Sequence, residues 1–107
     1  MSERFWASGH WQVGEGKDEQ FIQQWREWLS RSSENVAGFH HARLLRALNS
    51  RQQFTSISEW DTAEARDAWK ANPAFREGFE ASKALCDEFV GGDYDEVVIV
   101  RPGTEPS

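Results

Sequence analysis

Cysteine, methionine and tyrosine are almost missing from this sequence of 107 residues, which holds one of each. The single cysteine, Cys86, excludes an internal disulfide and is typical of a reducing compartment. No stretch approaches the ~20 apolar residues that a membrane-spanning helix needs, and the first residues lack the apolar core of a signal peptide. We therefore expect a cytoplasmic protein with no membrane segment.

Positive charge is scarce as well. The chain has 12 Lys and Arg residues against 18 Asp and Glu residues, a net charge of −6 at pH 7, and no basic stripe. Nucleic acids and anionic membrane surfaces both require a cationic surface, so neither is expected as a partner. Large aromatic side chains are abundant instead, with six Trp and seven Phe. They can fill a small core, and they also suit a flat, apolar ligand.

The length of the chain predicts a single domain, placed over residues 1–100, and the tail at 101–107 is expected to be disordered. Apolar residues between Phe21 and Leu29 fall on one stripe of a helix. Asp61 is expected to cap the next helical region, with Glu64 three residues later. The expected elements are a strand at 5–13, a helix at 17–32 and strands at 39–48 and 54–60. They are followed by a helical region from 61, which restarts at Pro73 and includes Cys86 and Phe89, and by a strand at 94–100 after the break at 91–93.

The strand at 39–48 has a competing interpretation as a helix, because alanine, leucine and arginine favour helices. Gly38 before it and the turn at Asn49-Ser50 after it favour a hairpin. The resulting β-α-β-β-α-β order is an α+β, ferredoxin-like arrangement with helices on one face of an antiparallel sheet. Phe5 and Trp6 are adjacent, and 97–100 is an unbroken apolar run, so both sheet faces carry apolar side chains. A homodimer packed sheet against sheet would cover the second face.

Four motifs, in this order and spacing, resemble the antibiotic biosynthesis monooxygenase domain family of dimeric α+β barrels. They are the Gly16-Lys17 turn with Phe21 behind it, GFHHARLL at 38–45, SEWDTAEARDAW at 58–69, and NPAF at 72–75. The resemblance covers about residues 5–100. This family includes cofactor-free oxygenases of polyketide anthrones, quinol monooxygenases and haem-degrading enzymes.

The resemblance also implies roles for individual residues. Trp60, in EWD, is similar to a recurrent pocket tryptophan that would hold a flat ring and donate its N–H to an oxygen. Gly9 stands where oxygenase and haem-degrading members place an Asn. Phe79 stands where haem-degrading members place the His that binds iron, which argues against haem degradation. Trp69 stands where many members have His, but its spacing from Ala65 also fits a core position.

Histidine supplies the candidate bases, because a neutral imidazole accepts a proton near pH 7. His10 neighbours Gly9, although strand alternation points it to the opposite face of the sheet. His41 is the other candidate; of the adjacent His40 and His41, one is expected to face the helices and the other the seam between sheets. Arg43 could neutralise an enolate or phenolate, or pair with a carboxylate across the dimer. The candidate substrate contacts are Gly9, Trp11, Trp25, Arg43, Trp69 and Phe79.

These residues support one enzymatic hypothesis and two alternatives. The first is a small monooxygenase that uses dioxygen and an anthrone-, phenol- or quinol-like substrate and needs no cofactor, because the substrate itself donates the electrons. The second is a ligand-binding or structural dimer without chemistry, and the third is a haem protein. No metal site is expected, because the acidic residues between Asp87 and Glu96 alternate along a loop and a strand. Cys86 is expected to be a small buried hydrophobe rather than a nucleophile.

Overall fold

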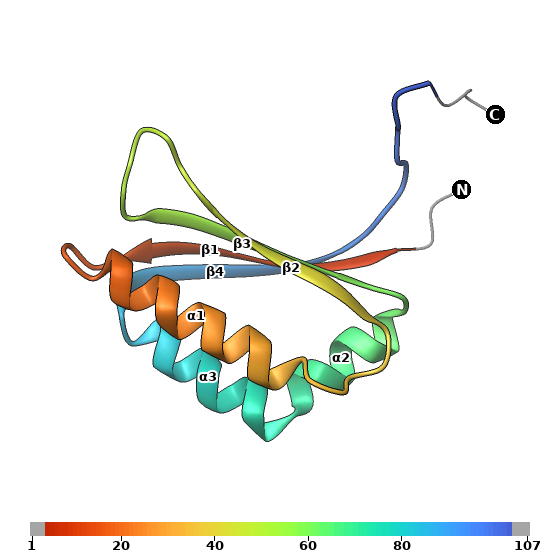
Figure 1. The fold of residues 1–107 in the computed structure, drawn as a ribbon, viewed down its shortest axis with the longest axis horizontal. Coiled ribbons are helices and arrows are strands. Elements are labelled where there is room, and N and C mark those ends of the chain that lie inside the picture. Colours follow the sequence, from red (N-terminus) through yellow and green to blue (C-terminus); the bar gives the residue numbers. More distant parts are fainter. Residues whose placement is uncertain (1–3, 104–107) are drawn as a thin grey trace.

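A four-stranded antiparallel sheet carries all of the described helices on one of its faces (Figure 1). The computed structural model describes residues 4–103. Its elements are β1 (Phe5–Val13), α1 (Asp18–Ser32), β2 (Phe39–Arg46), β3 (Gln53–Trp60), α2 (Ala63–Ala71), α3 (Pro73–Lys83) and β4 (Cys86–Asp95). The strand order β2-β3-β1-β4, with every neighbouring pair antiparallel, confirms the predicted ferredoxin-like α+β fold.

Strand alternation separates the two faces of the sheet. Ala7, Trp11 and Val13 of β1 are buried toward the helices, where they meet Phe21 and Trp28 of α1. The helical stripe predicted for α1 is therefore confirmed, although Trp25 on the same stripe is only half-buried. In the strand register Gly9 lies opposite Ser56 of β3 on one side and Gly91 of β4 on the other. Gly9, Ser56 and Gly91 are therefore neighbours on three adjacent strands, on the face of the sheet that the helices cover.

The second helical region is split as the proline predicted. Pro73 begins α3, and the side chain of Asn72 caps that helix by accepting the N–H of Ala74 at 2.8 Å. The prediction that Asp61 caps α2 was wrong. Thr62 is the cap, and its hydroxyl accepts the N–H of Ala65 at 3.0 Å. Asp61 instead bonds to His40 and Arg4, so its carboxylate is not available to the first turn.

The last strand lies earlier than predicted. Cys86 and Phe89 belong to β4 rather than to the helix, and the glycines at 91 and 92 lie inside the strand instead of ending it. A Cβ on Gly91 would lie 3.0 Å from the ring of Phe89, and one on Gly92 would lie 2.7 Å from the hydroxyl of Tyr94. Glycine is used here because aromatic rings lie close to the strand backbone. Strand β2 also ends two residues early, at Arg46.

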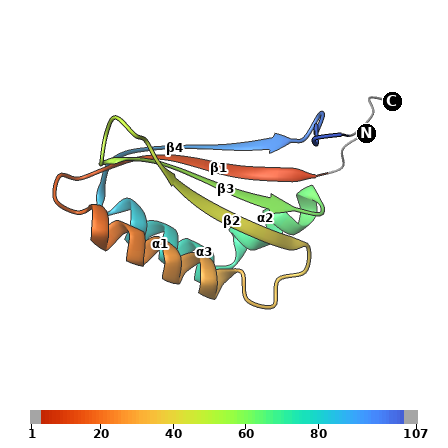
Figure 2. The same ribbon diagram turned by 45° about the horizontal axis from the view of Figure 1, so that its top comes forward.

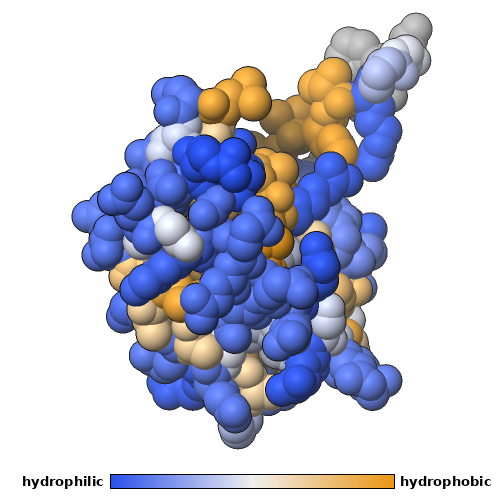
Figure 3. Space-filling view, turned by 60° about the vertical axis from the view of Figure 1, so that its left-hand side comes forward, coloured by the Kyte–Doolittle hydropathy of each residue, from blue (hydrophilic) through white to orange (hydrophobic). Residues whose placement is uncertain are grey.

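Residues 97–100 do not form the predicted buried strand. Their side chains are 47–84% exposed, and the segment leaves the sheet after Glu96, whose N–H bonds to the carbonyl of Arg4 at 2.8 Å (Figures 1 and 2). In the space-filling view this apolar segment projects from the body of the domain (Figure 3). Of the tail predicted to be disordered, 104–107 lies outside the described residues.

The other face of the sheet has no helix over it (Figure 2). It carries large apolar side chains that are about half exposed, with Leu45 at 51%, Val90 at 57% and Tyr94 at 54%. This agrees with the expectation that both faces bear apolar residues. Within residues 4–103, no helix has the length and apolar character needed to cross a membrane.

Candidate functional site

A cavity of about 380 Å³ lies between the sheet and the helices. This volume falls in the range of ~300–1,000 Å³ that is usual for sites of small organic ligands. Every described strand and helix contributes to its lining. The lining residues are Ala7, Ser8, Gly9, Trp11, Trp25, Trp28, Leu29, Ala42, Ser56, Ile57, Ser58, Trp69, Lys70, Phe75, Phe79, Phe89, Gly91, Gly92 and Asp93.

Aromatic rings form the walls of this cavity. Trp11 lies at the centre of the group, with its ring 4.3 Å from that of Phe89 and 6.0 Å from that of Phe79, measured between centroids. Phe75 and Phe79 stack with an interplanar angle of 7°. Rings that contact one another on several sides support each other's positions, so the walls of the cavity are largely apolar and preformed.

Gly9 is crowded rather than open. A Cβ at this position would lie 2.7 Å from Nε1 of Trp11, 2.8 Å from Cε1 of Phe89 and 3.0 Å from Oγ of Ser56. The glycine therefore allows Trp11 and Phe89 to approach the backbone of β1, as glycine within a strand often does. The space that the resemblance assigns to an asparagine is occupied by an indole and a serine hydroxyl.

Two serines on β3 supply polar atoms at the sheet side of the cavity. Trp11 donates its indole N–H to Oγ of Ser56 at 2.9 Å, and Trp60 donates its indole N–H to Oγ of Ser58, also at 2.9 Å. The two serines are two positions apart on one strand, so they share a face of the sheet. Both line the cavity.

Lys70 of α2 and Asp93 of β4 form an ion pair at the partly exposed rim of the cavity. A second cation supports the carboxylate, because Nε of Arg66 lies 3.8 Å from Asp93. Arg66 also donates to the backbone carbonyl of Trp6 at 3.3 Å. These contacts tie α2 to the end of the sheet. Among the lining residues, the ionisable side chains are those of Lys70 and Asp93.

Trp60 lies behind the cavity wall and does not line it. Its side chain is fully buried, its ring packs 4.9 Å from that of Trp69 and 5.2 Å from that of Phe39, and its N–H is bonded to Ser58. The indole N–H of Trp60, which the resemblance implies would donate to a ligand oxygen, is thus already bonded to Ser58. Trp60 contacts two residues that do line the cavity, Ser58 through its hydrogen bond and Trp69 through ring packing.

The predicted bases do not reach the cavity. His10 is exposed on the uncovered face of the sheet, where its Nδ1 lies 3.2 Å from the hydroxyl of Thr55. His41 also lies outside the cavity lining; its Nε2 pairs with Glu59 at 2.8 Å, and its ring contacts Trp6 edge to face. Arg43 is exposed and is likewise absent from the lining.

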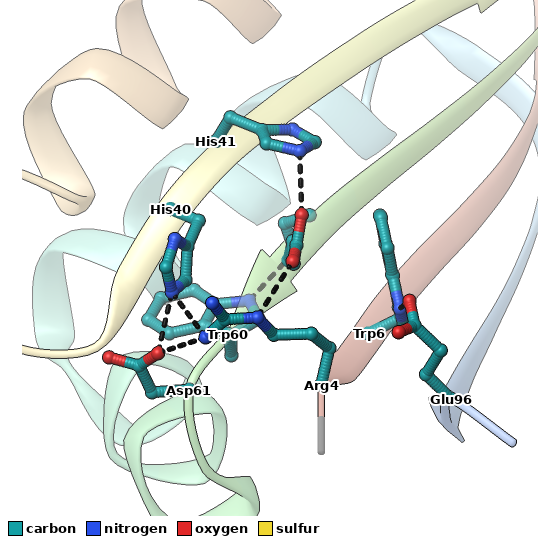
Figure 4. Close-up of polar contacts among 9 residues, drawn as sticks. Arg4, Trp6, His40, His41, Trp60, Asp61 and Glu96 are labelled. Carbon is teal, nitrogen blue, oxygen red and sulfur yellow. Dashed lines mark hydrogen bonds and ion pairs between the residues drawn. The ribbon is translucent and has the colours of Figure 1, made fainter. Parts of the chain in front are cut away.

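A polar cluster surrounds His40 and His41 at one end of the sheet (Figure 4). Arg4 lies between two carboxylates there, bonding to Asp61 and placing its Nε 3.2 Å from Glu59. Alternation alone predicted that one of these two histidines faces the helices. Neither lines the cavity on the helix-covered face, because His40 lies within a register irregularity of β2. The hydrogen bond with His40, aided by the charges of His40 and Arg4, lowers the pKa of Asp61 below its ordinary value.

Cys86 is not equipped as a nucleophile. Burial, with a smaller contribution from the charge of Asp87, raises the pKa of its thiol to about 11. The thiolate is the reactive form of cysteine, so the group is almost entirely protonated at neutral pH. Among the described residues, no group of three or more His, Cys, Asp or Glu side chains gathers as it would around a metal ion.

The cavity brings together five of the predicted site residues: Gly9, Trp11, Trp25, Trp69 and Phe79. It excludes Trp60, His10, His41 and Arg43 from its lining, and it adds residues that the sequence did not single out. Among those additions are Trp28, Ser56, Ser58, Lys70, Phe89 and Asp93. The small polar serines at alternate positions of the FTSISEW strand were the available signal, because a buried face that carries serine leaves both space and hydroxyl groups.

Comparison with solved structures finds similar folds. SnoaB, a cofactor-independent oxygenase from Streptomyces nogalater, is 18% identical with a TM-score of 0.81, covering 92% of this chain and 98% of that chain. A conserved protein from Methanosarcina mazei Go1 is 17% identical with a TM-score of 0.79, covering 88% and 93%. Protein SO0527 from Shewanella oneidensis is 18% identical with a TM-score of 0.79, covering 92% and 96%.

A family model described as antibiotic biosynthesis monooxygenase matches residues 5–81. This range holds β1 to α3 except for the last two residues of that helix, and so includes most of the cavity wall. Comparison with curated proteins finds no significant match.

Proposed function

Because this chain belongs to the antibiotic biosynthesis monooxygenase family, to which residues 5–81 match, we propose that it is a cofactor-independent monooxygenase of flat aromatic compounds. The aromatic cavity between sheet and helices is the observation that carries this proposal. Its walls are rings in mutual contact, and its few polar side chains are three serines (Ser8, Ser56 and Ser58), a lysine and an aspartate. Such a site binds an anthrone-, phenol- or quinol-like ring system and excludes water from it.

The proposed reaction needs only the substrate and dioxygen. A ring CH₂ group, or the C–H group of a phenolic ring, becomes a carbonyl. One oxygen atom of O₂ enters the product and the other leaves as water with two hydrogens of the substrate. The substrate supplies all four electrons, so no external reductant is required. The protein's contribution is to hold the deprotonated substrate in a dry cavity, where its electron-rich form reacts with O₂.

Residues at the rim and walls divide this work. Asp93 is the carboxylate among the lining residues and is the proposed proton acceptor for a substrate that enters between α2 and β4. Lys70, its ion-pair partner, balances the negative charge that develops on the substrate. Trp11, Trp69 and Phe79 hold the ring by stacking and edge contacts.

Oxygen uptake with a panel of anthrones, naphthols and quinols tests this function. We expect uptake above the buffer rate for at least one ring system, with one atom of ¹⁸O from ¹⁸O₂ in the product. Asp93→Asn is expected to slow the reaction, whereas the matched Asp95→Asn variant, which changes an exposed carboxylate outside the lining, keeps the rate. If no ring in the panel consumes oxygen, the proposal is wrong.

A homodimer is proposed on the basis of the uncovered sheet face. Leu45, Val90 and Tyr94 are about half exposed on it, and two copies packed face to face would bury them together. Sedimentation at micromolar concentration is expected to give twice the mass of one chain. Val90→Glu should shift the equilibrium to monomer, whereas Ala81→Glu, which adds the same charge on an exposed position of α3, should leave it unchanged. A monomeric wild type would contradict this.

A ligand-binding dimer without turnover is the second candidate, because no histidine lines the cavity and the space at Gly9 is filled by Trp11 and Phe89. It predicts quenching of tryptophan fluorescence by aromatic ligands with no oxygen uptake. A haem role is disfavoured, because none of the three histidines of the chain lies in the cavity lining and Phe79 does. A haemin titration is expected to give no Soret shift.

A further inference from the structure

Three buried tryptophans donate their indole N–H groups to serine hydroxyls, but the three serines are not equivalent. Ser32 accepts from Trp69 at 3.0 Å and passes its own hydrogen to the backbone carbonyl of Trp28 at 2.7 Å. Ser56 and Ser58 each accept an indole N–H. Neither of these two hydroxyls donates to any acceptor within residues 4–103.

A serine hydroxyl has one hydrogen to donate and lone pairs to accept with, whereas an indole N–H only donates. The two indoles therefore occupy an acceptor position on each oxygen and leave each hydroxyl hydrogen without a protein partner. Buried donors are normally satisfied, and Ser58 is only 3% exposed. Because both serines line the cavity, a bound molecule is in position to supply the missing acceptor.

We propose that Ser56 and Ser58 form an oxyanion-binding pair that selects aromatic ligands carrying an ionised hydroxyl, a phenolate or enolate, on the ring edge that faces β3. This inference rests on the proposed aromatic site and adds the ligand's charge and orientation. Accepting an indole N–H polarises each O–H and strengthens it as a donor. The two residues are about 6.6 Å apart along the strand, from a rise of ~3.3 Å per residue, so their hydroxyls can converge on one oxygen or take two neighbouring ones.

The indoles behind the serines also fix the direction of the hydroxyls. Trp11 is held against Phe89 and Phe79, and Trp60 is packed between Phe39 and Trp69. Donors held in place before the ligand arrives stabilise negative charge more than donors that must reorient. In this arrangement Trp60 is a positioning residue, because it acts on the ligand oxygen through Ser58.

The test uses 2-hydroxyanthraquinone, whose absorption shifts when its hydroxyl ionises, with 2-methoxyanthraquinone as the matched ring that cannot ionise. Binding of each is followed by quenching of tryptophan fluorescence, and the pKa of the bound hydroxyl by its absorption. We expect the bound hydroxyl to ionise about one pH unit lower than the free one, which corresponds to about tenfold tighter binding of the anion.

Ser56→Ala and Ser58→Ala are each expected to weaken binding of the anion by about tenfold, as the loss of a hydrogen bond to a charged group does. Binding of the methoxy ring should change less than about threefold, since the bond that is lost serves the anion. Ser32→Ala is the matched control. It removes the same kind of hydroxyl partner from Trp69, but Ser32 itself does not line the cavity, so the pKa of the bound probe should stay unchanged. Ser56→Thr, which restores a hydroxyl, should recover part of the preference. If Ser58→Ala does not fold, Ser56→Ala alone decides the outcome.

Two results would overturn the proposal and are distinct from each other. If both rings bind wild type equally and the serine variants weaken both alike, the serines only shape the cavity, and the aromatic site stands without an oxyanion pair. If neither ring binds, the aromatic site itself is wrong and this inference falls with it. Anion preference that disappears in the serine variants and persists in Ser32→Ala supports the assignment.

Discussion

Trp60→Ala is expected to lower the free energy of unfolding by about 3–5 kcal/mol, the usual cost of removing a large buried aromatic side chain. The side chain is fully buried, its ring packs against Trp69 and Phe39, and its N–H is bonded to Ser58. The change would leave a void in the core and remove the donor to Ser58. Urea denaturation followed by far-UV circular dichroism measures the loss.

Trp25→Ala is the matched comparison, because it deletes the same side chain from a half-buried position at the cavity. We expect a loss of about 1–2 kcal/mol, since only part of its surface is removed from water on folding. Trp60→Phe should fall between the two, because the ring remains and the hydrogen bond does not. Equal losses for the two alanine variants would contradict the placement of Trp60 in the core and Trp25 at the cavity.

The elements that depend on local periodicity could be predicted from the sequence. The apolar stripe of α1 and the restart of the helix at Pro73 both follow from side-chain spacing and backbone chemistry within a few residues. The last strand could not be placed, because Gly91 and Gly92 are typical of a chain break when considered alone. Their role as contacts for Phe89 and Tyr94 depends on rings that fold back over the strand.

The same distinction applies to the site. Aromatic residues such as Trp11 and Phe79 could be proposed as cavity walls from type and resemblance, and both line the cavity. For Ser56 the alternation of serines along its strand was a signal, but its role as the partner of Trp11 depends on the register that places it opposite Gly9. His10 was a candidate because it neighbours Gly9 in sequence, yet adjacent residues of a strand point to opposite faces. The alternation argument against His10 was the better guide to its position.

Gly9→Asn is expected to destabilise the domain, although it would restore the residue type that the family resemblance assigns to this position. An added Cβ would lie 2.7 Å from Nε1 of Trp11 and 2.8 Å from the ring of Phe89, so at least one ring must move. Overpacking of this kind costs about 1–3 kcal/mol. Displacing Trp11 would also break its hydrogen bond to Ser56, which adds about 1 kcal/mol.

Gly91→Asn is a useful comparison, because Gly91 lies opposite Gly9 on the neighbouring strand, and its Cβ would meet the Phe89 ring at the longer distance of 3.0 Å. A thermal melt of both variants should therefore show the larger drop for Gly9→Asn, and binding of aromatic ligands should weaken in parallel. An unchanged melting temperature for Gly9→Asn would mean that Trp11 and Phe89 yield without cost, and that the space above Gly9 is available to a ligand. The crowding by two rings and one hydroxyl, all within 3.0 Å of a single carbon, favours destabilisation. On this geometry, an asparagine at position 9 would disrupt the hydrogen bond between Trp11 and Ser56, and so would displace one polar group of the cavity while adding another.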